Sequence, residues 1–232
     1  MTGSTGHPLD NAVWASLATN QDAISETLGT ARRYPADVNI FHGVERCDEQ
    51  GWQDLAALAG PSHTVVLFRD EVPAAPEGWD PLFSGQGNQM LLDRLIDPGT
   101  ADIRLLTDAD APAMLELATT TKPGPFFART HELGRYFGVF DGDALVAMAG
   151  ERLHPPGHRE ISAVCTDPVA RGRGLAAALT AHVARAIIAD GEQPFLHVGG
   201  DNHDARRVYE RLGFVTRRMV TFQALRTPAA PV

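Results

Sequence analysis

The sequence predicts an α/β (α+β mixed-sheet) protein that divides into two domains. The order of elements predicts the fold class, and the chain length and a turn motif predict the division. From residue 101 onward, strand-like and helix-like patterns follow the order βα, three strands, α, β, α, β, which is typical of a mixed sheet with helices on its faces. The length of 232 residues fits one large domain or two small ones. Asp97-Pro98-Gly99-Thr100 has turn chemistry. We therefore expect an N-terminal α/β domain over residues 1–97 and a second domain over residues 101–228.

The first half carries short α and β patterns without a chemical motif. Apolar residues from Leu9 to Leu28 at helical spacing predict an amphipathic helix. Further along, the pattern predicts a strand at 38–41, a helix around 52–59 that stops at Gly60-Pro61, a strand at 64–68, a proline-rich loop at 73–81 and a strand at 86–92.

The second half has clearer punctuation. A hairpin is expected to turn at Asp141-Gly142, and Gly191 and Gly213 are expected to end helices. The expected elements are strands at 103–106, 136–140, 144–151, 160–166 and 194–198, helices at 108–118, 173–190 and 202–212, and one or two strands within 214–225.

Composition excludes several classes of function. The net charge of −9 disfavours non-specific binding to nucleic acid or to an acidic membrane. The two cysteines, Cys47 and Cys165, show no metal-ligand spacing, so no metal is expected and a reducing compartment is favoured. No signal-peptide pattern opens the sequence, and no run approaches the roughly 20 apolar residues of a membrane span. We expect a cytoplasmic protein.

The passage from strand to helix at residues 167–174 is the sharpest chemical feature. Asp167-Pro168 ends the strand, and Arg171-Gly172-Arg173-Gly174 leads into the helix. Glycines let the backbone approach an anion, and a helix start presents unpaired N–H groups at the positive end of the dipole. The turn therefore favours a phosphate or pyrophosphate site. The alternative is an ordinary loop with two solvated arginines.

This turn resembles a known family signature. Arg171 to Ala176 fits the R/Q-x-x-G-x-G/A signature of the GNAT superfamily of N-acyltransferases. Thr166-Asp167-Pro168 before it resembles the family's strand end, and Asn202-x-x-Ala205-x-x-x-Tyr209-x-x-x-Gly213-Phe214 after it resembles a second family pattern. The resemblance covers roughly residues 101–226. Segments 160–164 and 194–198 look like the FR47-like branch, which is similar to glycine N-acyltransferases.

The resemblance implies a GNAT fold in the C-terminal half and acetyl-CoA (coenzyme A) as the acyl donor. A backbone amide near Val164 would polarise the thioester carbonyl. The implied cofactor-binding residues are Val164, Cys165, Thr166, Arg171, Gly172, Arg173, Gly174, Leu175, Ala176, Asn202 and Tyr209. The N-terminal half resembles a degenerate half of this kind that packs on the catalytic half.

Tyr209 is the candidate general acid that the resemblance implies, protonating the leaving thiolate. Asn202 lies seven residues earlier, so the two share a helix face within about 20°. Asn202 would bond the pantetheine arm or cap the helix. The alternatives are a core aromatic for Tyr209 and a plain helix cap for Asn202.

Glu160 is the candidate general base, at the offset before Arg171 that the resemblance implies. Alternation along a strand would place Glu160, Ser162, Val164 and Thr166 on one face. The alternative is an exposed glutamate paired with Arg159, and His154, His158 and Glu151 are weaker candidates for the base. Cys165 is expected to be a buried structural cysteine.

The acceptor site is expected in the loop between the first helix and second strand of this half, with Phe126, Phe127, Arg129 and Arg135 as candidate substrate residues. Either arginine could bind an acceptor carboxylate, although solvated arginines are the alternative. The predicted function is acetyl transfer to the primary amine of a small molecule or amino acid by direct attack. Alternatives are a non-catalytic acyl-CoA-binding or sensing module and, more weakly, a nucleotide-binding α/β protein.

Overall fold

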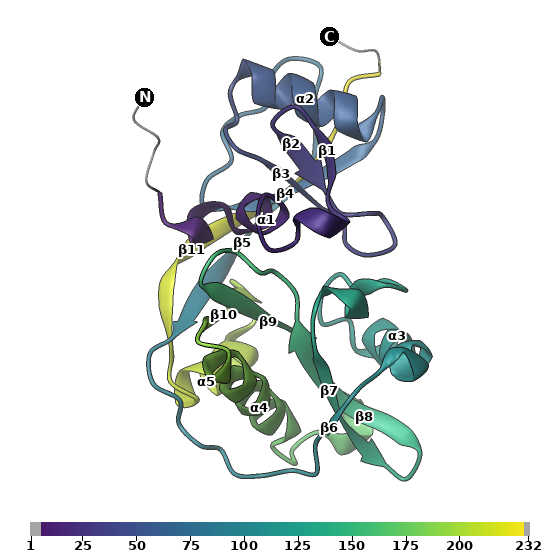
Figure 1. Ribbon diagram of the computed structural model, residues 1–232, viewed down its shortest axis with the longest axis vertical. Coiled ribbons are helices and arrows are strands. Elements are labelled where there is room, and N and C mark those ends of the chain that lie inside the picture. Colours follow the sequence, from purple (N-terminus) through teal and green to yellow (C-terminus); the bar gives the residue numbers. More distant parts are fainter. Residues whose placement is uncertain (1–5, 230–232) are drawn as a thin grey trace.

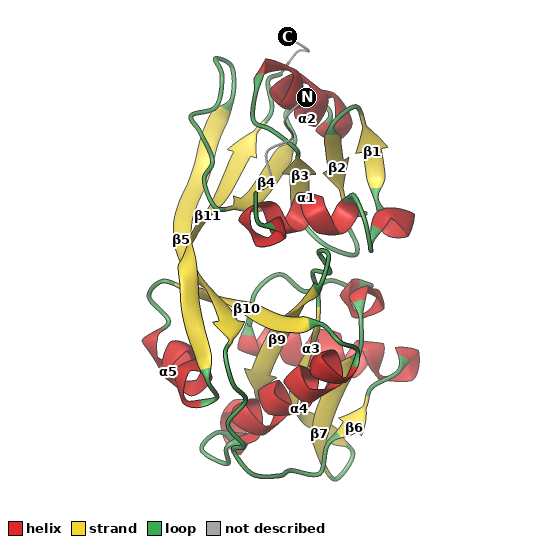
Figure 2. Ribbon diagram, turned by 60° about the vertical axis from the view of Figure 1, so that its left-hand side comes forward, coloured by secondary structure: helices red, strands yellow, loops and turns green. Residues whose placement is uncertain are grey.

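One continuous sheet of eleven strands runs through the protein (Figures 1 and 2). The computed structural model describes residues 6–229. The strand order is β1-β2-β3-β4-β11-β5-β10-β9-β8-β7-β6. Figure 1 shows an upper lobe with α1, α2 and β1 to β4, and a lower lobe with α3 to α5 and β6 to β10. Two long strands, β5 and β11, run through both lobes.

The upper lobe confirms the predicted short helix and the strand after it. Asp48 accepts a hydrogen bond from the Gly51 N–H at the start of α2, and Gly60 with φ 87° ends this helix. The elements are α1 (Ala12–Leu17), α2 (Glu49–Ala59), β1 (Glu26–Leu28), β2 (Ala31–Arg33), β3 (Phe41–Val44) and β4 (Thr64–Arg69).

The prediction of one helix from Leu9 to Leu28 is wrong. The carbonyl of Ser16 accepts from the N–H groups of Thr19 and Gln21, which turns the chain after α1, and Leu28 lies in β1. The strand predicted at 38–41 begins at Phe41 instead. The Pro35 carbonyl accepts from two following amides and holds residues 35–39 in a turn.

The lower lobe has the predicted order of elements. Met148 packs in a cluster with α3, while its neighbours Ala147 and Ala149 pack in a cluster with α4. The two helices therefore cover opposite faces of the sheet. The elements are α3 (Ala111–Thr121), α4 (Leu175–Ala189), α5 (His203–Arg211), β6 (Arg104–Leu105), β7 (Tyr136–Asp141), β8 (Ala144–Glu151), β9 (His158–Thr166) and β10 (Gln193–Gly199). None of the helices between residues 6 and 229 has the length and apolarity that a membrane crossing requires.

The long strands β5 (Asp80–Leu92) and β11 (Phe214–Arg226) join the lobes. They pair with each other along most of their length, while β5 also pairs with β10 and β11 with β4. The strand expected at 86–92 thus begins earlier, and residues 214–225 form one strand with register shifts. The division into domains at residues 97–101 stays a prediction. Residues before it supply β5 to the sheet of the lower lobe.

The parallel strands β9 and β10 part within the sheet. They pair from His158 opposite Gln193 only as far as Ile161 opposite Leu196. Just beyond, the register between β8 and β9 shifts and Ala163 has φ 52°. Ile161 and Val164 consequently pack in the same cluster. The expected common face of Glu160, Ser162, Val164 and Thr166 is therefore wrong.

Gly213, which joins α5 to β11, is expected to tolerate no side chain. Its φ is 95°, and an added Cβ would lie 1.9 Å from the carbonyl oxygen of Arg94. Gly142 is the matched control, because it has φ 60° and nothing lies within 4 Å of its Cβ position. Gly142→Ala should cost about 1 kcal/mol of unfolding free energy in urea, and Gly213→Ala about 2 kcal/mol more. Equal losses of unfolding free energy in the two variants would show that the Arg94 carbonyl moves aside to accommodate the new methyl group.

Candidate active site

A cavity of about 670 Å³ opens where β9 and β10 part, and we call it the strand-gap cavity. Three parts of the chain form its walls: the end of β9, the turn that leads into α4, and one side of α5. Its lining includes Ile161, Ser162, Ala163, Val164, Cys165, Thr166, Ala170, Arg171, Gly172, Gly174, Leu175, Ala176, Ala177, Asn202, Ala205 and Tyr209. All the predicted cofactor-binding residues except Arg173 thus line one cavity.

The turn before α4 offers backbone amides to an anion. Gly172 has φ 77° and Gly174 has φ 74°, and nothing lies within 4 Å of a Cβ built on either residue. Gly174 caps the helix without a side-chain hydrogen bond, so the amides of the first turn have no partner within the helix. Open space thus lies over amides at the positive end of a helix dipole, which fits a pyrophosphate.

The two arginines of the turn contribute less than its backbone. Arg171 is exposed and its Nε lies 3.4 Å from the carbonyl oxygen of Thr166. Arg173 points to Asp141 on the β7–β8 hairpin, at 3.2 Å, and does not line the cavity. An anion at this turn would therefore be held mainly by peptide N–H groups.

The end of β9 adds a free polar atom to the cavity. The Oγ1 atom of Thr166 is buried and has no hydrogen-bond partner among the described residues, so it fits a polar ligand atom. Burial raises the pKa of the Cys165 thiol to about 11. This thiol is therefore protonated at neutral pH, which agrees with a structural cysteine.

Tyr209 and Asn202 line the opposite wall, on α5. Asn202 caps the helix, because its Oδ1 accepts from the Ala205 N–H at 3.1 Å. The Tyr209 ring packs edge-on against Phe214, and the residue is 8% exposed. Burial raises the pKa of Tyr209 to about 12. Its hydroxyl therefore keeps its proton at neutral pH and can donate it.

Glu160 lies behind the cavity, fully buried in a network of hydrogen bonds. Arg152 donates to both carboxylate oxygens, at 2.8 and 2.7 Å, and the Leu153 N–H donates at 3.3 Å. His197 Nδ1 lies 2.7 Å from Oε1. The pairing with Arg159 considered from the sequence does not form, because Arg159 bonds Glu151 and Asp190 instead.

This network fixes the charges of its members. Burial by itself would raise the pKa of Glu160, but Arg152 and the hydrogen bond from His197 outweigh it and lower the pKa to about 2. Burial lowers the pKa of His197. Its Nε2 lies 3.1 Å from Nε2 of Gln89, an amide donor, so the neutral ring donates from Nδ1 to Glu160 and accepts at Nε2. Glu160 is therefore an ionised carboxylate, and both of its oxygens already accept hydrogen bonds from protein groups.

A second cavity of about 520 Å³ adjoins the first, and we call it the aromatic cavity. Four phenylalanines from four neighbouring strands line it: Phe41, Phe68, Phe83 and Phe222. The two cavities share a wall made of Pro123, Arg152, His197, Val198 and Gly199. The two cavities are therefore direct neighbours, lined in part by the same five residues.

Sequence reasoning missed Arg152 and His197. The sequence gives only a weak signal for either residue: Arg152 is a charged residue directly after an apolar strand, and His197 is a histidine inside another. Their contact with Glu160 depends on how the strands pair. Glu160 lies opposite Phe195, two residues from His197, and Arg152 follows Glu151, which pairs with Ile161.

The predicted substrate residues lie elsewhere. Arg129 bonds Asp37 and Glu132, while Arg135 bonds Glu151 and Asp190. Phe126 packs against Tyr136, and neither Phe126 nor Phe127 lines the two cavities. The same loop does reach the aromatic cavity through residues 123–125. The role assigned to these four residues stays a prediction.

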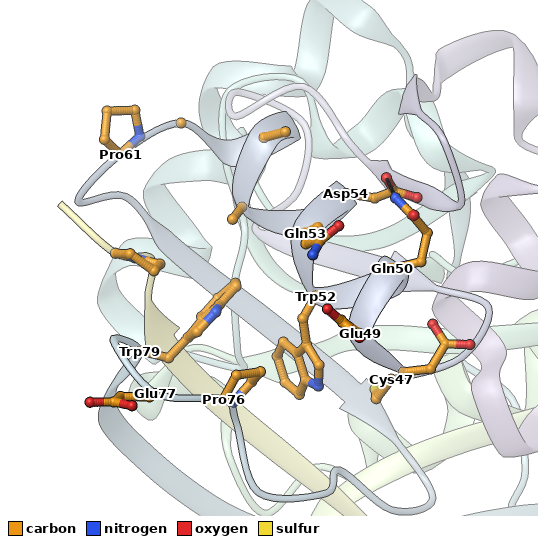
Figure 3. A pocket seen from close by; sticks show the side chains of 15 residues that line it. Cys47, Glu49, Gln50, Trp52, Gln53, Asp54, Pro61, Pro76, Glu77 and Trp79 are labelled. Carbon is orange, nitrogen blue, oxygen red and sulfur yellow. Dashed lines mark hydrogen bonds between the residues drawn. The ribbon is translucent and has the colours of Figure 1, made fainter. Parts of the chain in front are cut away.

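A third cavity, of about 870 Å³, lies in the upper lobe beside α2 (Figure 3). Trp52 and Trp79 form its apolar wall, with ring centroids 5.1 Å apart. Its other labelled lining residues include the acidic side chains of Glu49 and Glu77. None of the residues predicted to act in acyl transfer lines this cavity. The candidate active site therefore comprises the strand-gap cavity and the aromatic cavity.

Comparisons with known proteins bear on the family of this chain. The sequence model of the family described as FR47-like protein matches residues 136–222. A crystal structure of a GNAT-family protein from Novosphingobium aromaticivorans has 36% identity and a TM-score of 0.88, covering 97% of this chain and all of the other. A GCN5-related N-acetyltransferase from Kribbella flavida, at 16% identity and a TM-score of 0.65, shares the fold over 97% of this chain and 98% of its own.

Curated relatives match over shorter segments. Mycothiol acetyltransferase from Mycolicibacterium gilvum is 38% identical over 87 residues, which is 34% of this chain and 29% of that protein. The same enzyme from Mycobacterium avium is 42% identical over 107 residues, which is 40% of this chain and 34% of that protein. The chain thus spans about a third of the length of these relatives. The 36% identity over nearly the whole chain, together with the shared fold, shows that this chain belongs to the GNAT family of acyltransferases.

Proposed function

We propose that the protein transfers an acetyl group from acetyl-CoA to the primary amine of a small molecule by direct attack. The observation that supports this is the shared wall of the strand-gap cavity and the aromatic cavity. Donor and acceptor would occupy adjoining cavities, so the reacting atoms could meet without a covalent enzyme intermediate. Cys165, buried and protonated, offers no nucleophile for the alternative route.

Acetyl-CoA in the strand-gap cavity would supply an activated acyl group as a thioester. The amides around Gly172 and Gly174 would hold the pyrophosphate, and the Thr166 hydroxyl would bond a polar atom of the donor. The backbone near Val164, beside the register shift in β9, would face the thioester carbonyl. Tyr209 would donate its proton to the departing sulfur.

For Glu160 we propose a role other than the general base, acting directly or through water, that the resemblance implies. It lines neither cavity, and a pKa of about 2 makes it a weak proton acceptor. We assign it the role of a positioning residue that holds Arg152 and His197 in the shared wall. The amine nitrogen would then lose its proton to water in the cavities, since each carries solvent-accessible space.

Replacing Gly174 should abolish coenzyme A binding. Gly174→Val would place a side chain in the open space over the turn, where the pyrophosphate is expected. Gly191→Val, at the other end of the same helix, is the matched control, since Gly191 has φ 80° and equally open surroundings. Coenzyme A should raise the melting temperature of the wild type and of Gly191→Val, but not of Gly174→Val. A normal shift in Gly174→Val would remove the turn from the site.

Removing the Tyr209 hydroxyl should slow turnover and leave donor binding intact. We expect Tyr209→Phe to lower kcat by about 10²-fold or more, because general acids contribute rate enhancements of that order. Tyr136→Phe is the control, since Tyr136 is buried, its hydroxyl has no partner among the described residues, and it lines neither cavity. Thiol release with an acetylated amine as product provides the measurement. Equal rates for wild type and Tyr209→Phe would contradict the assignment.

The Glu160 network should make stability depend on acid. The folded pKa of about 2 lies below the ordinary value of 4.5, so the carboxylate stabilises the fold above pH 4.5 and loses this contribution as the pH falls towards 2. Glu160→Gln should cost about 3–5 kcal/mol of unfolding free energy at pH 7, because the buried charge of Arg152 loses its partner. The loss should shrink at pH 3.

Glu210→Gln is the matched control for this measurement. Glu210 pairs with Arg206 on the surface of α5, at 2.8 Å. Its replacement should cost about 0.5 kcal/mol or less at either pH, because exposed pairs contribute little. Urea unfolding at both pH values compares the variants. A loss for Glu160→Gln that matches the control would mean that the buried pair does not stabilise the fold.

A further inference from the structure

Aromatic rings form one wall of the aromatic cavity. Phe41, Phe68, Phe222 and Phe83 come from β3, β4, β11 and β5, which are consecutive neighbours in the sheet. Successive ring centroids lie 5.4 to 5.9 Å apart, and the His197 ring lies 4.3 Å from that of Phe68. Together these rings make a continuous aromatic face.

Part of this face is open to solvent. Phe83 is 57% exposed and Phe222 is half-buried, whereas Phe41 and Phe68 are buried beneath them. An exposed phenylalanine is ordinary by itself, but here it continues a buried aromatic cluster into a cavity. Apolar surface that enters the cavity would leave water on contact with these rings.

Two of the three ionisable side chains that line the aromatic cavity lie where it adjoins the strand-gap cavity. Arg152 and His197 belong to the shared wall, and Asp201 is the other ionisable side chain among the lining residues. The charge of Arg152 is balanced by Glu160 behind it, and His197 is neutral. The rest of the lining has few side chains that could bond several hydroxyl groups.

From this arrangement we propose that the acceptor is a primary amine carrying one aromatic body. The body would lie on the accessible rings of Phe83 and Phe222, which pack over Phe41 and Phe68, and the amino group would reach the shared wall. The cavity volume of about 520 Å³ falls within the usual range for small-molecule sites. The inference rests on the proposed function: a bond forms between the amine nitrogen and the acyl carbon, and the carbon–sulfur bond breaks. The nitrogen loses a proton to water, the sulfur gains one from Tyr209, and Tyr209 regains a proton from water, so that the protons balance.

Two amines with the same aminoethyl unit provide the test. We expect kcat/KM for 2-phenylethylamine to exceed that for ethanolamine by about tenfold or more, because only the phenyl group can leave water on the aromatic face. 2-Phenylethylamine, and not ethanolamine, should also raise the melting temperature without any acyl donor. Equal or better use of ethanolamine would overturn the proposal. So would an absence of turnover with 2-phenylethylamine while coenzyme A still raises the melting temperature.

Variants locate the effect on the aromatic face. Phe83→Ser and Phe222→Ser should each reduce the ratio of kcat/KM for 2-phenylethylamine to kcat/KM for ethanolamine by at least about threefold. Phe140→Ser is the control, because Phe140 is also half-buried but lies on β7 and lines neither cavity. An unchanged preference in Phe83→Ser, whose side chain is mostly exposed and whose fold should survive, would overturn the proposal. If the wild type neither binds coenzyme A nor acetylates any amine, the proposed function itself is overturned.

Discussion

The buried pairing of Glu160 with Arg152 is the contact on which the geometry of the site depends. Arg152 follows β8, Glu160 lies on β9, His197 on β10 and Gln89 on β5, and these are four neighbouring strands. The hydrogen bonds among them cross the sheet just before β9 and β10 stop pairing. These hydrogen bonds thus hold the four strands together beside the point where β9 and β10 separate.

A buried charge pair stabilises a fold only when its hydrogen bonds are complete, because removal from water costs each ion several kcal/mol. Here the carboxylate receives bonds from the guanidinium, the imidazole and the Leu153 N–H. Beyond the network, Ala163 with φ 52° takes up the register shift of β9. This conformation is uncommon for a residue with a side chain, and it accompanies the turn of the strand end towards the strand-gap cavity.

The sequence predicted the parts of the site that depend on local chemistry. The glycine turn, the cap at Asn202 and the order of elements in the second half follow from spacing and turn residues, whereas the part of Tyr209 in the candidate site was implied by the resemblance to the GNAT superfamily. What depends on register could not be read in this way. The environment of Glu160 is set by Arg152 and His197, and the aromatic cavity is lined by phenylalanines up to about 180 residues apart that only the sheet brings together. The helix predicted over residues 9–28 fails for a related reason, since loop amides bonding to Ser16 override the apolar spacing.

The continuity of β5 and β11 has a mechanical consequence. Both strands pass from one lobe to the other without an intervening loop, paired with each other along the way (Figure 2). Phe83 and Phe222 of the aromatic cavity lie on these strands, and β11 starts directly after the helix that carries Tyr209. Bending the lobes apart would require breaking ladder hydrogen bonds in the middle of the sheet. The spacing between the aromatic cavity and the strand-gap cavity is therefore stiff, and the exposed ring of Phe83 gives the aromatic cavity an open side that needs no hinge.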